Sequence, residues 1–382
     1  MIVPLVTHGA PDSGDPAEVA IVASTGQTAC SGTVIDPHFV LTAAHCVVPQ
    51  IEHGARVVFG ASVASPAGSA PVAALRTHPA YDPGTFANDA AIVVLGASVS
   101  VVPAQLATAP PATGSLLNVV GWGETAADAG DYGEKRAGAA LVSAVGSLSF
   151  DATPDPSQPC LGDSGGGAFA SGTGGGDLLL GITSHGDATC ATRATFTRVD
   201  AVTAGFIAPT LAALGPGTAA AGARCLYPEQ CKTGGAAACI AAQDQPGLSY
   251  CTLPCAVGSD CPAGMRCALA GVGGSVCVYE APTPGAFGGA CTVDGDCYDG
   301  VCVSGVCTMR CVPTDDTCPA GATCQDQDEG IDFYCVLRPP SAPTAGCSVE
   351  RRPSAGRAAV LALELAALLA VARARRRRRP PW

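Results

Sequence analysis

Residues 160–167 read Cys160-Leu161-Gly162-Asp163-Ser164-Gly165-Gly166-Gly167. Glycine at positions 162, 165 and 166 allows a sharp turn, because a residue without a Cβ tolerates backbone conformations that other residues avoid. A serine hydroxyl on such a turn can approach a substrate closely, and neighbouring backbone N–H groups can stabilise an oxyanion. A glycine-rich turn with one serine is common, so this segment alone does not establish a catalytic site.

Two other segments supply the groups that a serine nucleophile needs, a base and a residue that orients the base. The first is Leu41-Thr42-Ala43-Ala44-His45-Cys46, and the second is Asn88-Asp89-Ala90-Ala91-Ile92-Val93-Val94-Leu95. An isolated His is more often structural than catalytic, and an Asp that opens an apolar strand can be a turn residue. Their order along the chain, His before Asp before Ser, makes a catalytic interpretation stronger.

These three segments resemble the TAAHC, D-[IA]-A-[LV] and GDSGG motifs of the chymotrypsin/trypsin family of serine peptidases, and Val119–Gly123 resembles its GWG segment. The resemblance covers residues 6–207 and implies a double β-barrel with a triad of His45, Asp89 and Ser164. In the implied mechanism His45 is the general base and then the general acid, and Ser164 forms an acyl-enzyme. The N–H groups of Gly162 and Ser164 would form the oxyanion hole. Gly167 departs from the family, which mostly has Pro there.

The resemblance also implies two disulfides, a substrate pocket and an activation site. The pocket residue that is Asp in trypsin-like members is Gln158 here, Ala194 should narrow the pocket, and His185 replaces the usual Trp. We therefore expect no strong preference for Arg or Lys. A new amino terminus at Val6 would pair with Asp163 after zymogen cleavage, although a constitutively ordered enzyme is the alternative. The implied disulfides are Cys30–Cys46 and Cys160–Cys190, and the substrate-binding residues are Gln158, Ser184, His185, Gly186 and Ala194.

Residues 6–207 also have the pattern of an all-β domain. Short apolar runs such as Val34–Thr42 and Leu178–Thr183 are separated by clusters of Gly, Pro, Asp and Ser, which is typical of a barrel or a sandwich. Residues Val199–Ile207 are predicted to form a closing helix, and residues 208–224 a linker.

The next part of the chain is rich in cysteine. Of the 21 Cys, 16 lie between Cys225 and Cys335, which indicates an oxidising compartment. They form two repeats of eight, residues 225–279 and 291–337, and an even number in each predicts disulfides without fixing their connectivity. Zinc binding is less favoured, because neither repeat contains a His or a C-x2-C pair. An inhibitory or calcium-binding role is a further alternative, but the acidic segments do not fit an EF-hand loop.

The end of the chain has a different composition. A linker, residues 338–346, precedes Cys347, the apolar segment Ala358–Ala372 and an Arg-rich terminus. Residues 347–382 resemble the myxobacterial-type C-terminal sorting signals, in which a Cys precedes a short transmembrane helix and basic residues. The resemblance implies processing and attachment at Cys347 by sorting machinery. A retained membrane anchor is the alternative, and a basic tail that binds nucleic acid is less favoured.

The charge distribution agrees with this division. The net charge is −12, and nine of the 20 basic residues lie after Cys347, so the rest of the chain is strongly acidic and should repel nucleic acid. The first ten residues, MIVPLVTHGA, do not resemble a signal peptide. We expect a leader upstream of this start, and unconventional export is the alternative.

Together these features predict a bacterial serine endopeptidase that is secreted or attached to the outer membrane surface. It would use no cofactor or metal and would cleave proteins or peptides, while its Cys-rich repeats bind substrate, surface or partner. The alternative is a surface adhesion protein with a relic peptidase domain. Because the triad and Gly162 are all present, the enzyme is favoured.

Overall fold

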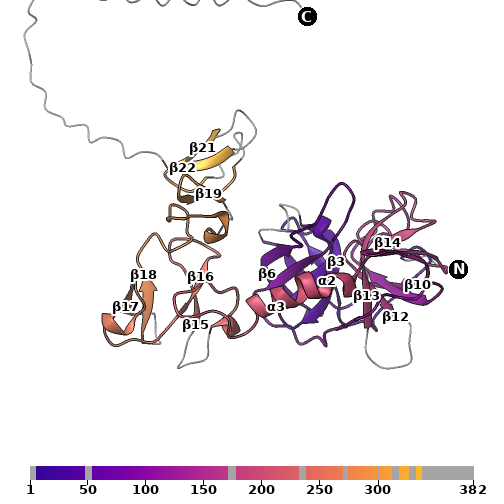
Figure 1. Ribbon diagram of the computed structural model, residues 1–382, viewed down its shortest axis with the longest axis horizontal. Coiled ribbons are helices and arrows are strands. Elements are labelled where there is room, and N and C mark those ends of the chain that lie inside the picture. The colour runs from indigo at the N-terminus through magenta and orange to yellow at the C-terminus, as the bar shows by residue number, and fades with distance from the viewer. Residues whose placement is uncertain are drawn as a thin grey trace, which may run out of the picture.

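The structure, a computed structural model, describes residues 6–47, 54–170, 178–231, 238–269, 274–298, 301–311, 318–326 and 333–337. Most of its elements are strands, which form two closed six-stranded barrels followed by a disulfide-rich region (Figure 1). The prediction of an all-β double barrel with a disulfide-rich extension is confirmed.

The first barrel closes in the order β2-β3-β4-β7-β6-β5. Its strands β2 and β7 are entirely buried, because their apolar side chains face either the barrel interior or the layers packed outside it. The strands are β2 (Glu18–Val22), β3 (Thr28–Asp36), β4 (Phe39–Thr42), β5 (Arg56–Phe59), β6 (Gly68–Thr77) and β7 (Ala91–Leu95).

The second barrel closes because β9 pairs with both β10 and β12. Two short strands, β1 (Ala10–Pro11) and β8 (Gln105–Leu106), add to its edges. Stacked rings of Phe150 and Phe196 lie in its core, with centroids 5.0 Å apart. The strands are β9 (Leu116–Gly121), β10 (Arg136–Val145), β11 (Ser149–Pro154), β12 (Gly167–Ala170), β13 (Leu178–Gly186) and β14 (Ala194–Arg198).

A helical segment closes the double barrel. It comprises α2 (Val199–Val202), a π-helical turn (Thr203–Ile207) and α3 (Ala208–Leu214). Val199, Val202, Phe206 and Ile207 lie on one face and join the core cluster that includes the first barrel. The predicted closing helix is therefore present, and α3 extends it into the first seven residues of the segment predicted to be a linker.

The disulfide-rich region begins against the first barrel. The ring of Tyr227 is fully buried and stacks on His38, with centroids 3.6 Å apart. The Tyr227 hydroxyl donates to Leu214 O at 2.7 Å, and Glu229 lies 3.5 Å from His38 Nε2. This stretch is thus packed onto the barrel, and Figure 1 shows β15 (Ala238–Ala241) and β16 (Ser249–Thr252) near the end of α3.

Four small units, each with two disulfides, make up this region. In each unit the first Cys pairs with the third and the second with the fourth, so the two bonds cross. We call them units 1 to 4; they span 225–251, 255–277, 291–307 and 311–335. The pairs are Cys225–Cys239, Cys231–Cys251, Cys255–Cys267, Cys261–Cys277, Cys291–Cys302, Cys297–Cys307, Cys311–Cys324 and Cys318–Cys335.

Each predicted repeat of eight Cys is therefore a pair of units. In both pairs the hydroxyl of the Thr just after the first unit donates to the carbonyl of the last Cys in the second unit: Thr252 to Cys277 O and Thr308 to Cys335 O. Each unit also contains a two-stranded hairpin: β15–β16, β17 (Met265–Leu269) with β18 (Ser275–Tyr279), β19 (Val301–Val303) with β20 (Val306–Thr308), and β21 (Ala322–Asp326) with β22 (Phe333–Leu337).

A recurring turn lies before the second Cys of units 2 and 3. Asp260 accepts the N–H groups of Ala256 and Val257, and Asp296 accepts those of Thr292 and Val293. In unit 1, Gln230 accepts the N–H of Leu226 in the same way. A side-chain acceptor one residue before the Cys therefore organises the turn, because it satisfies N–H groups that would otherwise lack a partner.

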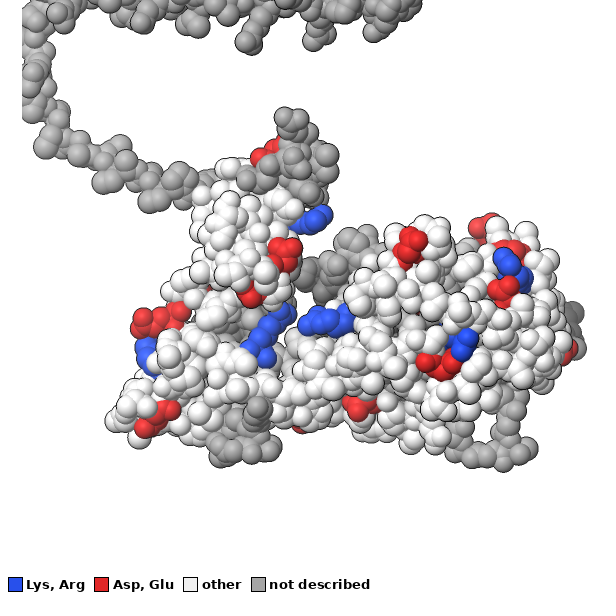
Figure 2. Space-filling view, viewed as in Figure 1, with Lys and Arg blue, Asp and Glu red and all other residues white. Residues whose placement is uncertain are grey.

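The predicted sorting signal, including Cys347, lies outside the described residues. Within the described ranges, the helices are too short or too polar to cross a membrane. The face shown in Figure 2 is mostly uncharged, with acidic and basic side chains scattered over it.

We predict that Tyr227→Ala destabilises the whole chain. A buried aromatic side chain typically contributes about 3–5 kcal/mol when it is truncated to Ala, and Tyr227 also loses its contacts with His38 and Leu214. The thermal midpoint by calorimetry should fall clearly, while Leu269→Ala, at a side chain that is 84% exposed, should leave it nearly unchanged. Equal midpoints for the two variants would contradict packing of unit 1 on the barrel.

Candidate active site

The turn that carries Ser164 precedes β12 of the second barrel and packs against the first barrel. Gly162 and Gly165 have φ values of +91° and +84°, which residues with a Cβ rarely adopt. A Cβ at Gly165 would also lie 2.0 Å from Thr42 Oγ1. The Ser164 carbonyl accepts a hydrogen bond of 2.8 Å from Ser31 N, in β3 of the first barrel. The glycines therefore allow the close approach of the two barrels at Ser164.

His45 and Asp89 are brought together by two paired strands. His45 lies in a 3-10 turn just after β4, and Asp89 lies just before β7, the strand that pairs with β4. His45 Nδ1 is 2.8 Å from Asp89 Oδ2, and His45 N donates to Asp89 Oδ1 at 2.9 Å. The predicted contact between these side chains is thus observed.

A third donor to Asp89 comes from the second barrel. The hydroxyl of Ser184, on β13, donates to Asp89 Oδ2 at 2.5 Å. Asp89 is completely buried. Burial acts to raise the pKa of its carboxyl, but hydrogen bonds from His45 and Ser184 outweigh it and hold the pKa below its ordinary value. Asp89 is therefore ionised, and it fixes the orientation of the His45 imidazole.

Ser164 and His45 face the same cleft, which has a volume of about 270 Å³. Among the described residues we observe no hydrogen bond between the Ser164 hydroxyl and the imidazole. Catalytic hydrogen bonds are often long without substrate. The other predicted residues that line this cleft are Ser184, His185, Gly186 and Ala194.

The turn at Gly162 is held by hydrogen bonds on both sides. The Ser31 hydroxyl donates to Gly162 O at 3.0 Å and accepts from Trp122 N at 3.0 Å. Next along the chain, the buried carboxylate of Asp163 accepts from Gly123 N at 2.7 Å and Cys160 N at 2.8 Å. Burial raises the pKa of Asp163 to about 6. A cation would stabilise the charged form of this carboxylate.

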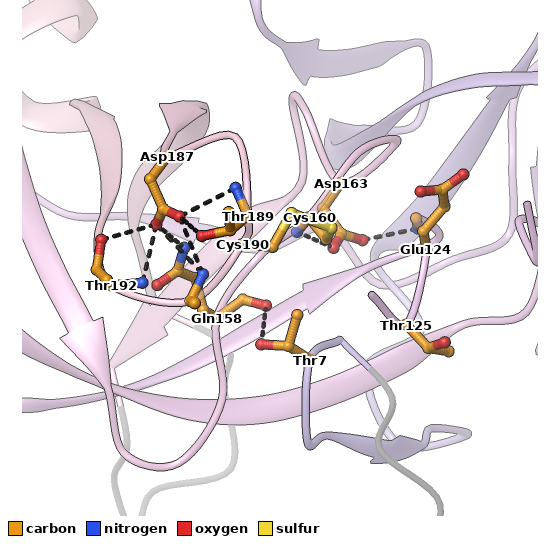
Figure 3. Close-up of a disulfide and its surroundings, with 12 residues drawn as sticks. Thr7, Glu124, Thr125, Gln158, Cys160, Asp163, Asp187, Thr189, Cys190 and Thr192 are labelled. Atoms are coloured by element: carbon orange, nitrogen blue, oxygen red, sulfur yellow. Dashed lines mark hydrogen bonds between the residues drawn. A yellow bond between two sulfur atoms is a disulfide. The ribbon is translucent and has the colours of Figure 1, made fainter. Parts of the chain in front are cut away.

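The residues proposed for activation lie close to this turn. Val6 is 2% exposed and packs in the core of the second barrel. Thr7 forms a β-bridge with Gln158, and its hydroxyl donates to Gln158 O at 3.2 Å (Figure 3). The start of the domain therefore contacts residue 158, which the family resemblance predicts to be a pocket residue.

Gln158 itself is engaged with a loop rather than placed on the cleft wall. Its side-chain amide donates to Asp187 Oδ2 at 3.0 Å and to Arg193 O at 3.1 Å (Figure 3). The Thr189 hydroxyl also donates to the Asp187 carboxylate, as do the N–H groups of Thr192 and Arg193. Together with the bond from Gln158, these hydrogen bonds hold the pKa of Asp187 far below its ordinary value. The charge of Asp187 therefore stabilises the loop that carries Cys190, and the sequence pattern did not predict this role.

Two disulfides brace the cleft as predicted. Cys30–Cys46 lies beside His45, and Cys160–Cys190 joins the turn before Ser164 to the Asp187 loop (Figure 3). Several groups of three residues lie close enough together to be considered as metal ligands. One is Cys30, Cys46 and His45, and the others consist of cysteines in the disulfide-rich region. Every Cys in these groups is in a disulfide, so none of them offers the thiolate through which a Cys binds zinc.

Phe86 is a cleft residue that the sequence analysis missed. Its ring lies 5.8 Å from that of His45 and 4.8 Å from that of His185, measured between centroids. Its φ of +56° is unusual for an aromatic residue. Strained backbone is often found at functional sites, but no sequence motif marks this position, two residues before Asn88.

Glu18 is a second residue that the sequence analysis missed. It is fully buried on β2, and its Oε2 accepts the hydroxyl of Thr33 at 3.0 Å and the N–H of Gly167 at 3.1 Å. Pro has no N–H, so this link depends on the Gly at 167. A Cβ at Gly167 would lie 2.4 Å from the Phe169 ring. Glu18 thus connects the first barrel to the strand that follows Ser164.

Comparisons with known proteins agree with this geometry. The trypsin family profile matches residues 6–204, just over half of the chain, so the chain belongs to the trypsin family and carries a trypsin-like serine protease domain. It is 34% identical to trypsin alpha-4 of Lucilia cuprina over 106 residues. This match covers 26% of this chain and 42% of that protein. It is 30% identical over 187 residues to serine protease 57 of Mus musculus, covering 44% and 64%.

Among solved structures, neuropsin, a serine protease expressed in the limbic system of mouse brain, superimposes with a TM-score of 0.48 and 23% identity. The match covers 53% of this chain and 98% of neuropsin. The chain spans less than half the length of the trypsin that it matches above.

We predict opposite effects for two substitutions of Glu18. Burial raises the pKa of Glu18 well above its ordinary value, so the folded protein binds this proton more tightly than the unfolded chain does. Stability is then lost as the pH rises from the unfolded pKa of about 4.3 through the folded pKa. Glu18→Gln keeps an acceptor without ionisation, so its free energy of unfolding relative to wild type should increase across this pH range.

Glu18→Ala should instead lower the free energy of unfolding by about 1–3 kcal/mol, because the Gly167 N–H and the Thr33 hydroxyl are left without an acceptor. Denaturant unfolding at several pH values measures both effects. Glu280→Gln, at an exposed carboxylate, is the matched control and should show neither. A difference between Glu18→Gln and wild type that does not vary with pH would contradict a buried, proton-binding Glu18.

Proposed function

We propose that the chain is a serine endopeptidase in which His45, Asp89 and Ser164 act as a catalytic triad. The observation that carries the proposal is the buried Asp89 carboxylate bonded to His45 Nδ1. That bond leaves Nε2 as the ring nitrogen available to the hydroxyl of Ser164, which lines the same cleft. Motif, order and family membership all favour this function.

In the proposed reaction the Ser164 hydroxyl attacks the peptide carbonyl while His45 takes its proton. The oxyanion is stabilised by the N–H groups of Gly162 and Ser164, and each such donor typically lowers the barrier by about 2.7–4 kcal/mol. His45 then gives the proton to the leaving amine, and water hydrolyses the acyl-enzyme. Asp89 holds the imidazole tautomer and stabilises the imidazolium.

We also propose activation by cleavage before Val6. The new ammonium would pair with Asp163, whose burial makes an uncompensated charge costly. Val6 already packs in the same barrel, and Thr7 contacts residue 158. The pair would stabilise the turn that positions the oxyanion hole.

Export to an oxidising compartment is proposed from the ten disulfides among the described residues, since such bonds rarely persist in the cytosol. Attachment to the bacterial surface through processing at Cys347, and a surface ligand for the Cys-rich units, stay predictions from the sequence.

We predict that Ser164→Ala abolishes labelling by a fluorophosphonate probe. Hydrolysis of fluorescent casein should fall by about four orders of magnitude or more, because the nucleophile and its acyl-enzyme are lost. Ser65→Ala, at an exposed serine, should behave as wild type. If processed wild-type protein is not labelled at all, the adhesion protein with a relic domain becomes the better interpretation.

We predict that a peptide library shows no dominant preference for Arg or Lys before the cleaved bond. Gln158 is uncharged, and the carboxylate of Asp187 is already bonded to Gln158 and to its own loop. Ala194 is 2% exposed on the cleft wall, so Ala194→Gly should broaden the preference toward larger side chains. A trypsin-like profile in wild type would contradict the assignment of the pocket.

A further inference from the structure

His185 lies beside Ser184 on β13, where the pairing with β14 shifts register between Thr183 and His185. Adjacent side chains of a regular strand point to opposite faces, but a bulge changes the direction of one of them. Both residues line the cleft, and His185 Nδ1 lies 3.2 Å from Ser184 Oγ. The irregular strand thus places a second imidazole beside the hydroxyl that bonds Asp89.

The hydrogen bonds from His185 to Ser184 and from Ser184 to Asp89 form a series, and the direction of each follows from its acceptor. An ionised carboxylate can only accept, so the Ser184 hydroxyl donates its proton to Asp89 Oδ2. Ser184 Oγ must then accept from His185, which requires the proton on His185 Nδ1. Neutral His185 therefore keeps its lone pair on Nε2.

The surroundings of His185 contain charges of both signs. Burial is the main influence and lowers the pKa of His185 below its ordinary value. Among the charges, Asp89 and Asp151 favour its protonation, whereas Arg193 and His45 oppose it. The Phe86 ring packs against both imidazoles, with its centroid 4.8 Å from that of His185 and 5.8 Å from that of His45. His185 is therefore neutral near pH 7, and it gains a charge near the triad only as the pH falls.

We propose that His185 is a positioning residue of the active site: its Nδ1–H orients the Ser184 hydroxyl toward Asp89, and its protonation opposes the imidazolium that forms at His45. This inference rests on the proposed endopeptidase function. It predicts that two imidazoles, His45 and His185, control the acid limb of the reaction. Because each protonation slows the reaction, the logarithm of the rate should fall more steeply with decreasing pH than a single protonation would cause.

The test compares four variants of the processed full chain with wild type. His185→Phe removes the donor and the ionisation, and His185→Asn keeps a donor near the position of Nδ1 without ionising. His185→Trp introduces the residue usual in the family, and His78→Phe removes an imidazole outside the cleft as the control. The readouts are the second-order rate of fluorophosphonate labelling and the turnover of fluorescent casein, from about pH 4 to pH 9, which spans the ordinary His range.

At neutral pH we expect His185→Phe to label about 2- to 10-fold more slowly, the range that one hydrogen bond covers, and His185→Asn to restore the rate. The acid limb should be steeper in wild type and His78→Phe, and should have a shallower slope, near one, in the three His185 variants. His185→Trp gives this slope even if His185→Phe does not fold.

A slope that is the same in wild type and in the His185 variants overturns the inference while leaving the peptidase function intact. Failure of Asn to restore the neutral rate overturns the positioning role. If processed wild-type protein shows neither labelling nor turnover, the proposed function fails, and this inference fails with it.

Discussion

The buried Asp89 carboxylate accepts hydrogen bonds from both barrels at the candidate active site. Its Oδ2 accepts from His45 of the first barrel and from Ser184 of the second, and its Oδ1 accepts from His45 N. A buried charge is tolerated only when hydrogen bonds replace the lost water. Since two of these donors come from different barrels, the charge of Asp89 requires the barrels to keep one relative arrangement.

The turn that carries Ser164 also depends on both barrels, because residues of β2 and β3 in the first barrel form hydrogen bonds with it. Ser31 contacts Gly162 and Ser164, and Glu18 contacts Gly167. The turn therefore does not depend only on its own backbone conformation. This support from β2 and β3 explains how a glycine at 167, which is more flexible than the proline usual in the family, can be accommodated.

Features encoded by local sequence were predicted well. The motifs around His45, Asp89 and Cys160 identified the double barrel, the His45–Asp89 contact and both barrel disulfides. Glu18 escaped prediction because its partner Gly167 is 149 residues away, and a single sequence does not show such pairs. Phe86 and the Asp187 loop depend on backbone conformations that no motif marks. The sequence indicates the four Cys-rich units only in part. Five residues separate the first two Cys in units 1, 2 and 3, but the pairing of the cysteines was not predicted.

The crossed disulfides of these units have a consequence for a chain that carries a protease. Wherever the backbone is cut once between the first and the fourth Cys of a unit, at least one of the two bonds spans the cut, so the pieces stay covalently joined. Among the units, a single scission can release a fragment only in the short connections 252–254, 278–290 and 308–310. The disulfide-rich region can therefore take a single cut inside any of its units without releasing a fragment.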